Sequence, residues 1–111
     1  MAHDFSTLSA LFETIASRQG ADPKSSYVAS LLAAGKGKVA RKVGEEAIET
    51  TVAALADGRE ALVAESADLL FHLMVLWVAC GVTPDDVMTE LKRREGISGL
   101  EEKRQRNKTA D

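Results

Sequence analysis

The sequence has little cysteine and little proline. Cys80 is the single cysteine among 111 residues, so no disulfide can form within the chain, and a reducing, cytoplasmic compartment is the simplest interpretation. The two prolines each stand beside a helix-start signal, in Asp22-Pro23 and in Thr83-Pro84. In both pairs a capping side chain precedes a proline suited to the first helical position.

The sequence also lacks a basic excess and a long hydrophobic run. Fourteen Lys and Arg residues oppose 17 Asp and Glu residues, a net charge of −3, which argues against a nucleic-acid-binding module. The longest apolar stretch, Leu69 to Cys80, is interrupted by His72 and is shorter than the ~20 residues that a membrane span needs. The amino terminus shows no basic-then-apolar signal peptide. We therefore expect a soluble, cytoplasmic protein with neither nucleic-acid nor membrane partners.

The remaining composition is that of one folded domain. The chain is 45% hydrophobic and 28% charged, and its length suits a single domain with a shallow core, which oligomerisation would supplement. No Asn-Gly hairpin signal or sustained alternation predicts a strand. The sequence predicts an all-α bundle of about five helices, over residues 5–19, 25–34, 37–56, 59–80 and 84–95. We expect one domain over 1–100 and a charged, mobile tail over 101–111.

Charged residues form a stripe along the predicted helix at 37–56. At 100° per residue the stripe lies within an arc of about 100°, and it comprises Lys38, Lys42, Glu45, Glu46 and Glu49. Apolar residues flank this arc on both sides, whereas a solvated helix usually has one apolar stripe. The pattern fits either carboxylates enclosed between packed helices or a surface stripe with ordinary i,i+4 pairs.

The predicted helix at 59–80 is apolar on nearly every side, which is typical of a buried central helix. Its exceptions on one face are Glu65, Asp68 and His72, which lie within about 60° of one another. Buried carboxylates need opposite charge, hydrogen bonds or a metal. Arg41 or Lys42 can compensate for one or two acids in a structural ion-pair network, but the two helices together carry five.

The acids have a spacing that favours a magnesium site. Glu46-x-x-Glu49 and Glu65-x-x-Asp68 are separated by fifteen residues, enough to end one helix, turn at Asp57-Gly58 and return alongside. Magnesium prefers oxygen ligands and commonly bridges carboxylates to substrate phosphates. A di-iron bundle would need inward Glu-x-x-His pairs, which are missing. We interpret His72 as a core or hydrogen-bonding residue rather than a ligand, placed to orient a carboxylate or contact substrate.

These motifs resemble those of the all-α nucleoside triphosphate pyrophosphohydrolase superfamily, which includes MazG and the dimeric dUTPases. Within it, the runs KVGEEAIE at 42–49 and ESADLLFHL at 65–73 are similar to the phosphoribosyl-ATP pyrophosphatase family. Three further segments, at 26–32, 81–87 and 93–99, are also similar to that family. The resemblance spans about residues 5–104, with small departures at Ser66 and Phe71, where alanine and tyrosine are frequent.

The resemblance implies hydrolysis of phosphoribosyl-ATP to phosphoribosyl-AMP and pyrophosphate, the second step of histidine biosynthesis. It implies a MazG-like fold, Mg²⁺ as cofactor and a homodimer of paired helical hairpins. Carried onto this sequence, the metal ligands are Glu46, Glu49, Glu65 and Asp68, and the candidate catalytic acids are Glu45 and Glu46. Glu45 is carried over as a ligand or as the base for the attacking water.

Several side chains are candidates for contacts with substrate and phosphate. Lys38 and Lys42 precede Glu46 by two turns and one turn of helix, and their alternative is a solvent-facing supporting role. Arg94 and Lys103 flank the glycine-containing segment 96–99, where backbone N–H groups can approach an anion; a plain helix end followed by a tail is the alternative. His72 is a further candidate for a contact with substrate. A single aromatic such as Tyr27 is more often packing than a base-stacking platform.

Two other functions fit part of the pattern. One is a house-cleaning pyrophosphohydrolase that acts on a different nucleotide. The other is a non-catalytic helical dimerisation module whose acids are only salt-bridged. Stabilisation by Mg²⁺ separates the enzymes from the module, because only a protein that binds the ion in its folded state gains stability from it.

Overall fold

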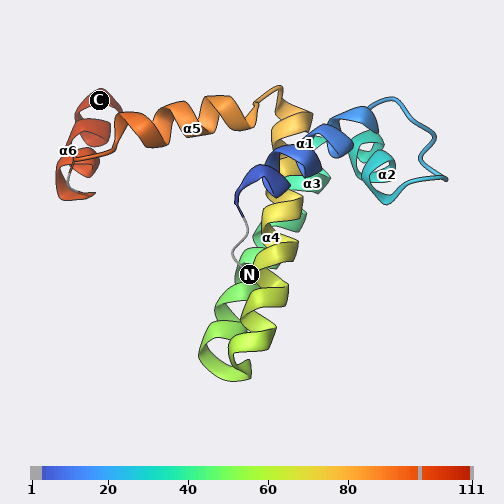
Figure 1. Ribbon diagram of the computed structural model, residues 1–111, viewed down its shortest axis with the longest axis horizontal. Coiled ribbons are helices and arrows are strands. Elements are labelled where there is room, and N and C mark those ends of the chain that lie inside the picture. Colours follow the sequence, from blue (N-terminus) through green and yellow to red (C-terminus); the bar gives the residue numbers. More distant parts are fainter. Residues whose placement is uncertain (1–3, 98, 111) are drawn as a thin grey trace.

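The protein is predominantly helical in the part of the chain that its computed structural model describes, residues 4–97 and 99–110. The elements are α1 (Ser6–Ser17), α2 (Tyr27–Ala34), α3 (Lys36–Val52), the π-helical turn η1 (Ala53–Asp57), α4 (Arg59–Cys80), α5 (Pro84–Arg93) and α6 (Gly99–Ala110), as Figure 1 shows. The described residues contain no strand. The predicted all-α class is therefore confirmed, and the predicted bounds of α4 agree with the structure.

The centre of the fold is the α3/α4 hairpin, in which the two helices pack along their length. Figure 1 shows the chain descending along α3, turning at the lower tip and returning along α4. The turn is made by η1, whose last ring closes through the Gly58 N–H to the Ala53 carbonyl at 3.1 Å. Gly58 has φ +94°, a conformation that glycine adopts without a Cβ penalty. The turn predicted at Asp57-Gly58 is confirmed, whereas the π turn was not predicted.

Helices α1 and α2 cover the upper half of α4 and enclose the core. Its buried members come from all four helices of this bundle: Ile15, Leu31, Val39, Met74, Val75 and Val78. Ser26 caps α2 by accepting a hydrogen bond from the Ala29 N–H at 3.2 Å. Asp22 instead accepts from the Lys24 N–H at 3.0 Å, so it closes the preceding turn. The predicted helix start beside Asp22-Pro23 was therefore wrong, because the serine four residues later is the cap.

Helices α5 and α6 form a separate α5/α6 arm, which projects sideways from the upper end of α4 (Figure 1). Thr83 caps the start of α5, as the Thr83-Pro84 signal predicted, and Asp86 completes a reciprocal capping box with it, which was not predicted. No residue of α5 is buried. The sequence predicted no helix at 99–110, where α6 lies, and the expected mobility of residues 101–111 stays a prediction.

The chain is more open than a compact monomer of its length. Its radius of gyration is 16.2 Å, against about 13 Å for a compact domain of this length. Its accessible surface is 8052 Å², about 2,000 Å² more than a monomer of this mass usually exposes. Helix α4 is long and apolar enough to cross a membrane by length and composition alone, yet it packs against α1, α2 and α3 as a central helix does. Much apolar surface is thus left uncovered in the single chain.

Candidate functional site

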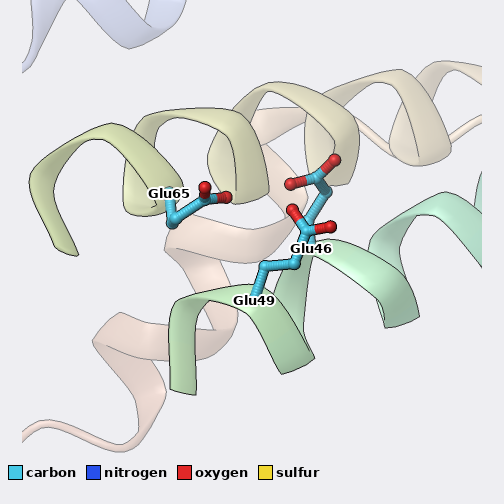
Figure 2. Close-up of side chains that lie close together, drawn as sticks. All are labelled: Glu46, Glu49 and Glu65. Atoms are coloured by element: carbon cyan, nitrogen blue, oxygen red, sulfur yellow. The ribbon is translucent and has the colours of Figure 1, made fainter. Parts of the chain in front are cut away.

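Three carboxylates meet between the two helices of the hairpin. Glu46 and Glu49 project from α3 toward α4, and Glu65 projects from α4 toward them (Figure 2). One oxygen from each lies within 4.8 Å of the others. The i,i+3 spacing places the first two acids on one face of α3, and the antiparallel return of α4 brings the third opposite. The predicted convergence of acids from two successive helices is confirmed for these three residues.

Burial leaves two of these acids short of partners. Glu46 is 7% exposed, and the buried Oε2 atoms of Glu46 and Glu65 have no hydrogen-bond partner among the described residues. Burial, and then the adjacent Glu49, raise the pKa of Glu65 above its ordinary value. Unpaired carboxylate oxygens and a carboxyl that resists ionisation show excess negative charge. A hard divalent cation, which binds through oxygen, fits this donor set.

Lys42 is the cation nearest to the acidic cluster, in the described part of the chain. Its Nζ lies 3.4 Å from Glu45 Oε2 and 3.8 Å from Glu46 Oε1. The hydrogen bond to Glu45 is the main reason that the pKa of Lys42 is raised. The side chain of Glu45 is 54% exposed and that of Lys42 is 30% exposed. One ammonium against the acids of this cluster does not neutralise them, so the ion-pair network alone does not account for the cluster.

Asp68 lies one turn beyond Glu65 on α4 and is exposed. Its charge contributes to the raised pKa of Glu65, so it is close enough to influence the cluster electrostatically. It is outside the group of three whose oxygens lie within 4.8 Å of one another. Its predicted role as a fourth ligand stays a prediction.

Sequence reasoning missed Thr50, which links the two helices at the site. Thr50 Oγ1 lies 2.7 Å from the carbonyl of Glu46 and 3.2 Å from the carbonyl of Glu65. A hydroxyl whose single proton is shared between the two carbonyls links the two acid-bearing backbones. The neighbouring Thr51 donates only to the Ala47 carbonyl of its own helix, at 3.0 Å. No local signal separates the two threonines, because the difference arises from the position of α4.

The other predicted contact residues lie in different places. His72 is 6% exposed, and both ring nitrogens have partners, Tyr27 at 2.9 Å and the Asp68 carbonyl at 2.8 Å. This geometry fits the hydrogen-bonding role of His72. Arg94 is on the α5/α6 arm, where it pairs with Glu90 at 3.2 Å, and Lys103 is exposed on α6.

Figure 1 shows this arm leading away from the hairpin, so a single chain does not bring Arg94 or Lys103 to the acids. Lys38 is exposed on α3, one turn before Lys42. The substrate contacts predicted for Lys38, Arg94, Lys103 and His72 stay predictions.

Comparison with known proteins agrees with this geometry. The phosphoribosyl-ATP pyrophosphohydrolase family matches the chain over residues 8–95. A phosphoribosyl-ATP pyrophosphatase of Paramagnetospirillum magneticum is 56% identical over 108 residues, which are 97% of this chain and 99% of the relative. One of Rhodospirillum rubrum is 58% identical over 91% of this chain and 86% of the relative. A phosphoribosyl-ATP pyrophosphatase of Erythrobacter litoralis is 60% identical over 90% of this chain and 96% of the relative.

These matches include both helices of the acidic cluster and most of the remaining fold. The family match begins within α1 and ends just after α5, so it covers every element that positions Glu46, Glu49 and Glu65. The resemblance seen in the runs at 42–49 and 65–73 is thereby confirmed. The chain belongs to the phosphoribosyl-ATP pyrophosphohydrolase family.

Proposed function

We propose that the chain hydrolyses phosphoribosyl-ATP to phosphoribosyl-AMP and pyrophosphate, the second step of histidine biosynthesis. The observation that carries this proposal is the cluster of Glu46, Glu49 and Glu65 within 4.8 Å, in a chain of this family. Relatives that share 50–60% of their residues with the chain bear the name of this enzyme. The reaction is attack of water on a phosphorus of the triphosphate, with pyrophosphate as the leaving group.

Magnesium is the proposed cofactor. Glu46, Glu49 and Glu65 would hold it, with Asp68 as a further direct or water-mediated ligand. The partnerless oxygens of Glu46 and Glu65 and the raised pKa of Glu65 support this assignment. When bound, the ion supplies charge neutralisation for the triphosphate oxygens and lowers the pKa of a bound water.

The remaining residues of the site bind phosphate and move a proton. Lys42, held beside Glu45 and Glu46, is placed to neutralise a phosphate oxygen, and Lys38 follows one turn away on the same helix. Glu45 and Glu46 are the candidates to accept the proton of the attacking water. Glu45 is the favoured base, because water can approach its exposed side chain, whereas the side chain of Glu46 is enclosed. Phosphoryl transfer depends chiefly on such positioning and charge neutralisation.

We further propose that the working form is a homodimer in the cytoplasm. Five large apolar side chains along the α3/α4 hairpin are 44–83% exposed: Ile48, Val52, Leu55, Val63 and Leu70. The excess accessible surface is of the size that a stable protein interface buries, about 1,200–2,000 Å² in total. Contributions of Arg94 and Lys103 to phosphate binding would require the arm of the second chain. Sedimentation velocity over a hundredfold range of protein concentration tests the dimer.

The test of function is pyrophosphate release from phosphoribosyl-ATP, with and without Mg²⁺, beside dUTP, dCTP and ATP. We expect release from phosphoribosyl-ATP alone and only with Mg²⁺. Release from a different triphosphate would keep the site and change the substrate. No release from any of them would contradict a catalytic role.

A further inference from the structure

Tyr27, the first residue of α2, is a large aromatic side chain that the fold leaves partly uncovered. It is 54% exposed, although it lies on the helix that follows α1 over the upper half of α4. Packing within the chain therefore accounts for only part of its surface.

Hydrogen bonds hold this exposed ring in one orientation. The Tyr27 hydroxyl lies 2.9 Å from Nε2 of His72, which is buried. His72 Nδ1 lies 2.8 Å from the carbonyl of Asp68, and a carbonyl only accepts, so Nδ1 carries the proton of the neutral ring and the Tyr27 hydroxyl donates to Nε2. The Ser26 cap fixes the first turn of α2. Tyr27 thus presents its ring to solvent from a fixed position.

Two aromatic neighbours fix the tilt of the same ring. The planes of Tyr27 and Phe71 are 14° from parallel, with centroids 6.3 Å apart. The ring of His72 stands at 82° to that of Tyr27, at 5.9 Å. Offset-stacked and edge-to-face arrangements of this kind are the ones that aromatic pairs prefer. Because more than half of Tyr27 remains exposed, these contacts leave room for a further planar ring against it.

The same contacts place Tyr27 beside the acidic cluster. Two successive hydrogen bonds, from Tyr27 to His72 and from His72 to the Asp68 carbonyl, connect it to the turn of α4 that follows Glu65. Glu65 is the α4 member of the cluster. In a nucleotide the ribose separates the base from the phosphates, so a surface for the base is expected next to a phosphate site and not within it.

A structural role explains the hydroxyl of Tyr27 but not its ring. The buried His72 needs a partner for its second nitrogen, and the Tyr27 hydroxyl supplies it. That role does not require an exposed aromatic face. An exposed, immobilised aromatic ring is the surface on which nucleic-acid bases stack, because every base has a flat π-face.

We propose that Tyr27 is a binding residue for the adenine ring of the substrate, which stacks on its exposed side while the triphosphate lies at the acids. His72 is the positioning residue that holds the tyrosine ring. This inference rests on the proposed function, because it names a contact with the substrate of that reaction. Its consequence is that Tyr27 affects the binding of ligands that carry the base and not of those that lack it.

The two products of the reaction provide the test, because phosphoribosyl-AMP carries the base and pyrophosphate does not. Tyr27→Leu keeps an apolar side chain and removes the ring. We expect it to weaken calorimetric binding of phosphoribosyl-AMP about tenfold and that of pyrophosphate with Mg²⁺ less than about twofold. Unchanged binding of phosphoribosyl-AMP, or equal weakening of both ligands, would overturn the proposal.

Tyr27→Phe separates the ring from the hydroxyl. It loses the hydrogen bond to His72 and keeps the π-face, so we expect phosphoribosyl-AMP to bind within about threefold of the native affinity. The same readout tests the positioning role of His72, because a small loss in Tyr27→Phe measures what orienting the ring contributes. A loss as large as in Tyr27→Leu would show that the hydroxyl is the important group and overturn stacking.

Phe5→Leu is the matched control, with the same exchange of an exposed aromatic for leucine. Phe5 is 83% exposed and lines an apolar pocket with Leu8 and Leu70. Leu70 lies about 200° around α4 from His72, so this pocket is on another side of the helix. We expect unchanged binding of both products. Weaker phosphoribosyl-AMP binding in Phe5→Leu, as large as in Tyr27→Leu, would indicate a general effect and contradict the proposal.

A spectroscopic measurement separates this inference from the proposed function. Tyr27 is the single tyrosine of the sequence, so ring-labelled ¹³C-tyrosine reports on it without a further substitution. We expect phosphoribosyl-AMP to shift its ring signals through the ring current of the stacked base, and pyrophosphate with Mg²⁺ to leave them nearly in place. No shift at millimolar phosphoribosyl-AMP would overturn the inference even if the enzyme is active. If the chain releases no pyrophosphate but the signals shift, the proposed function fails and the base contact stands.

Discussion

Two glutamates are buried among the described residues, in two regions that differ in charge balance. Glu46 in the α3/α4 hairpin is 7% exposed and Glu102 in the α5/α6 arm is 4% exposed, and each has a buried Oε2 atom without a hydrogen-bond partner among the described residues. Around Glu102 the neighbours are cationic: Arg93 lies 2.7 Å away, Arg94 3.7 Å and Arg106 3.9 Å. Around Glu46 the neighbours are two further acids and one lysine.

The comparison shows that burial of an acid does not by itself mark a site. Arginines of the arm neutralise the charge of Glu102, and the ion pair with Arg93 holds α6 against the end of α5. The hairpin concentrates acids without enough base, so the proposed cation, which the chain does not itself supply, would stabilise it. Excess of one charge, rather than burial, therefore distinguishes the two regions.

The largest expected effect on activity comes from neutralising the acids of the hairpin. Glu49→Gln and Asp68→Asn keep side-chain size and remove one proposed ligand charge each, and we expect each to lower kcat by about 10²–10³-fold. The helical circular dichroism spectrum should stay nearly unchanged, because neither residue is in the core. Retained activity in both variants would rule out the metal site, whereas retained activity in one would remove that residue from the ligand set.

A smaller effect on activity is expected from removing the hydrogen bond that links the backbones of α3 and α4 at the site. Thr50→Val removes the hydroxyl that links the carbonyls of Glu46 and Glu65, and we expect the Mg²⁺ concentration for half-maximal activity to rise about tenfold. Thr51→Val is the matched control, because Thr51 bonds only within α3. Equal Mg²⁺ requirements in the two variants would show that the link between α3 and α4 does not set the site.

The charge excess in the hairpin also predicts a gain of stability. Because the pKa of Glu65 is raised in the folded chain, its contribution is favourable below the unfolded value, near 4.5, and is lost as the pH rises through the folded value. Glu65→Gln should therefore raise the melting temperature at pH 7 by a few degrees in metal-free buffer, while abolishing turnover. Added Mg²⁺ should raise the melting temperature of the native chain and not of the variant.

The arm should respond to pH in the opposite direction and with the smallest effect. Hydrogen bonds from Arg93, and then Arg94, lower the pKa of Glu90 to about 2. Its contribution is present above the unfolded value of 4.5 and is lost as the pH falls toward 2. The protection of α5 amides, relative to the intrinsic exchange rate at each pH, should fall across this window in the native chain, whereas Glu90→Gln should flatten the dependence. An arm insensitive to pH in both chains would contradict the ion-pair description.

The contrast between the regions also explains what the sequence could predict. The bounds of α4 and the meeting of Glu46, Glu49 and Glu65 follow from helical periodicity, the glycine at the turn and fifteen intervening residues, all of which are local signals. Helix α6 has no apolar face that would predict it. It is held by an ion pair between Glu102 and Arg93 of α5, and helical periodicity does not predict a contact between two different helices. The Tyr27–His72 pair depends on how α2 packs against α4, which no spacing within either helix encodes.

The π turn at the tip of the hairpin has a consequence for how the chain tolerates a change in length. A π-helical ring holds one residue more than an α-helical ring, and here it is the ring closed between Ala53 and Gly58. Glu46 and Glu49 precede it and Glu65 follows it, so a one-residue deletion at the tip is absorbed by conversion of the ring to α-helix. A chain shortened there by one residue would therefore keep its acids opposite one another.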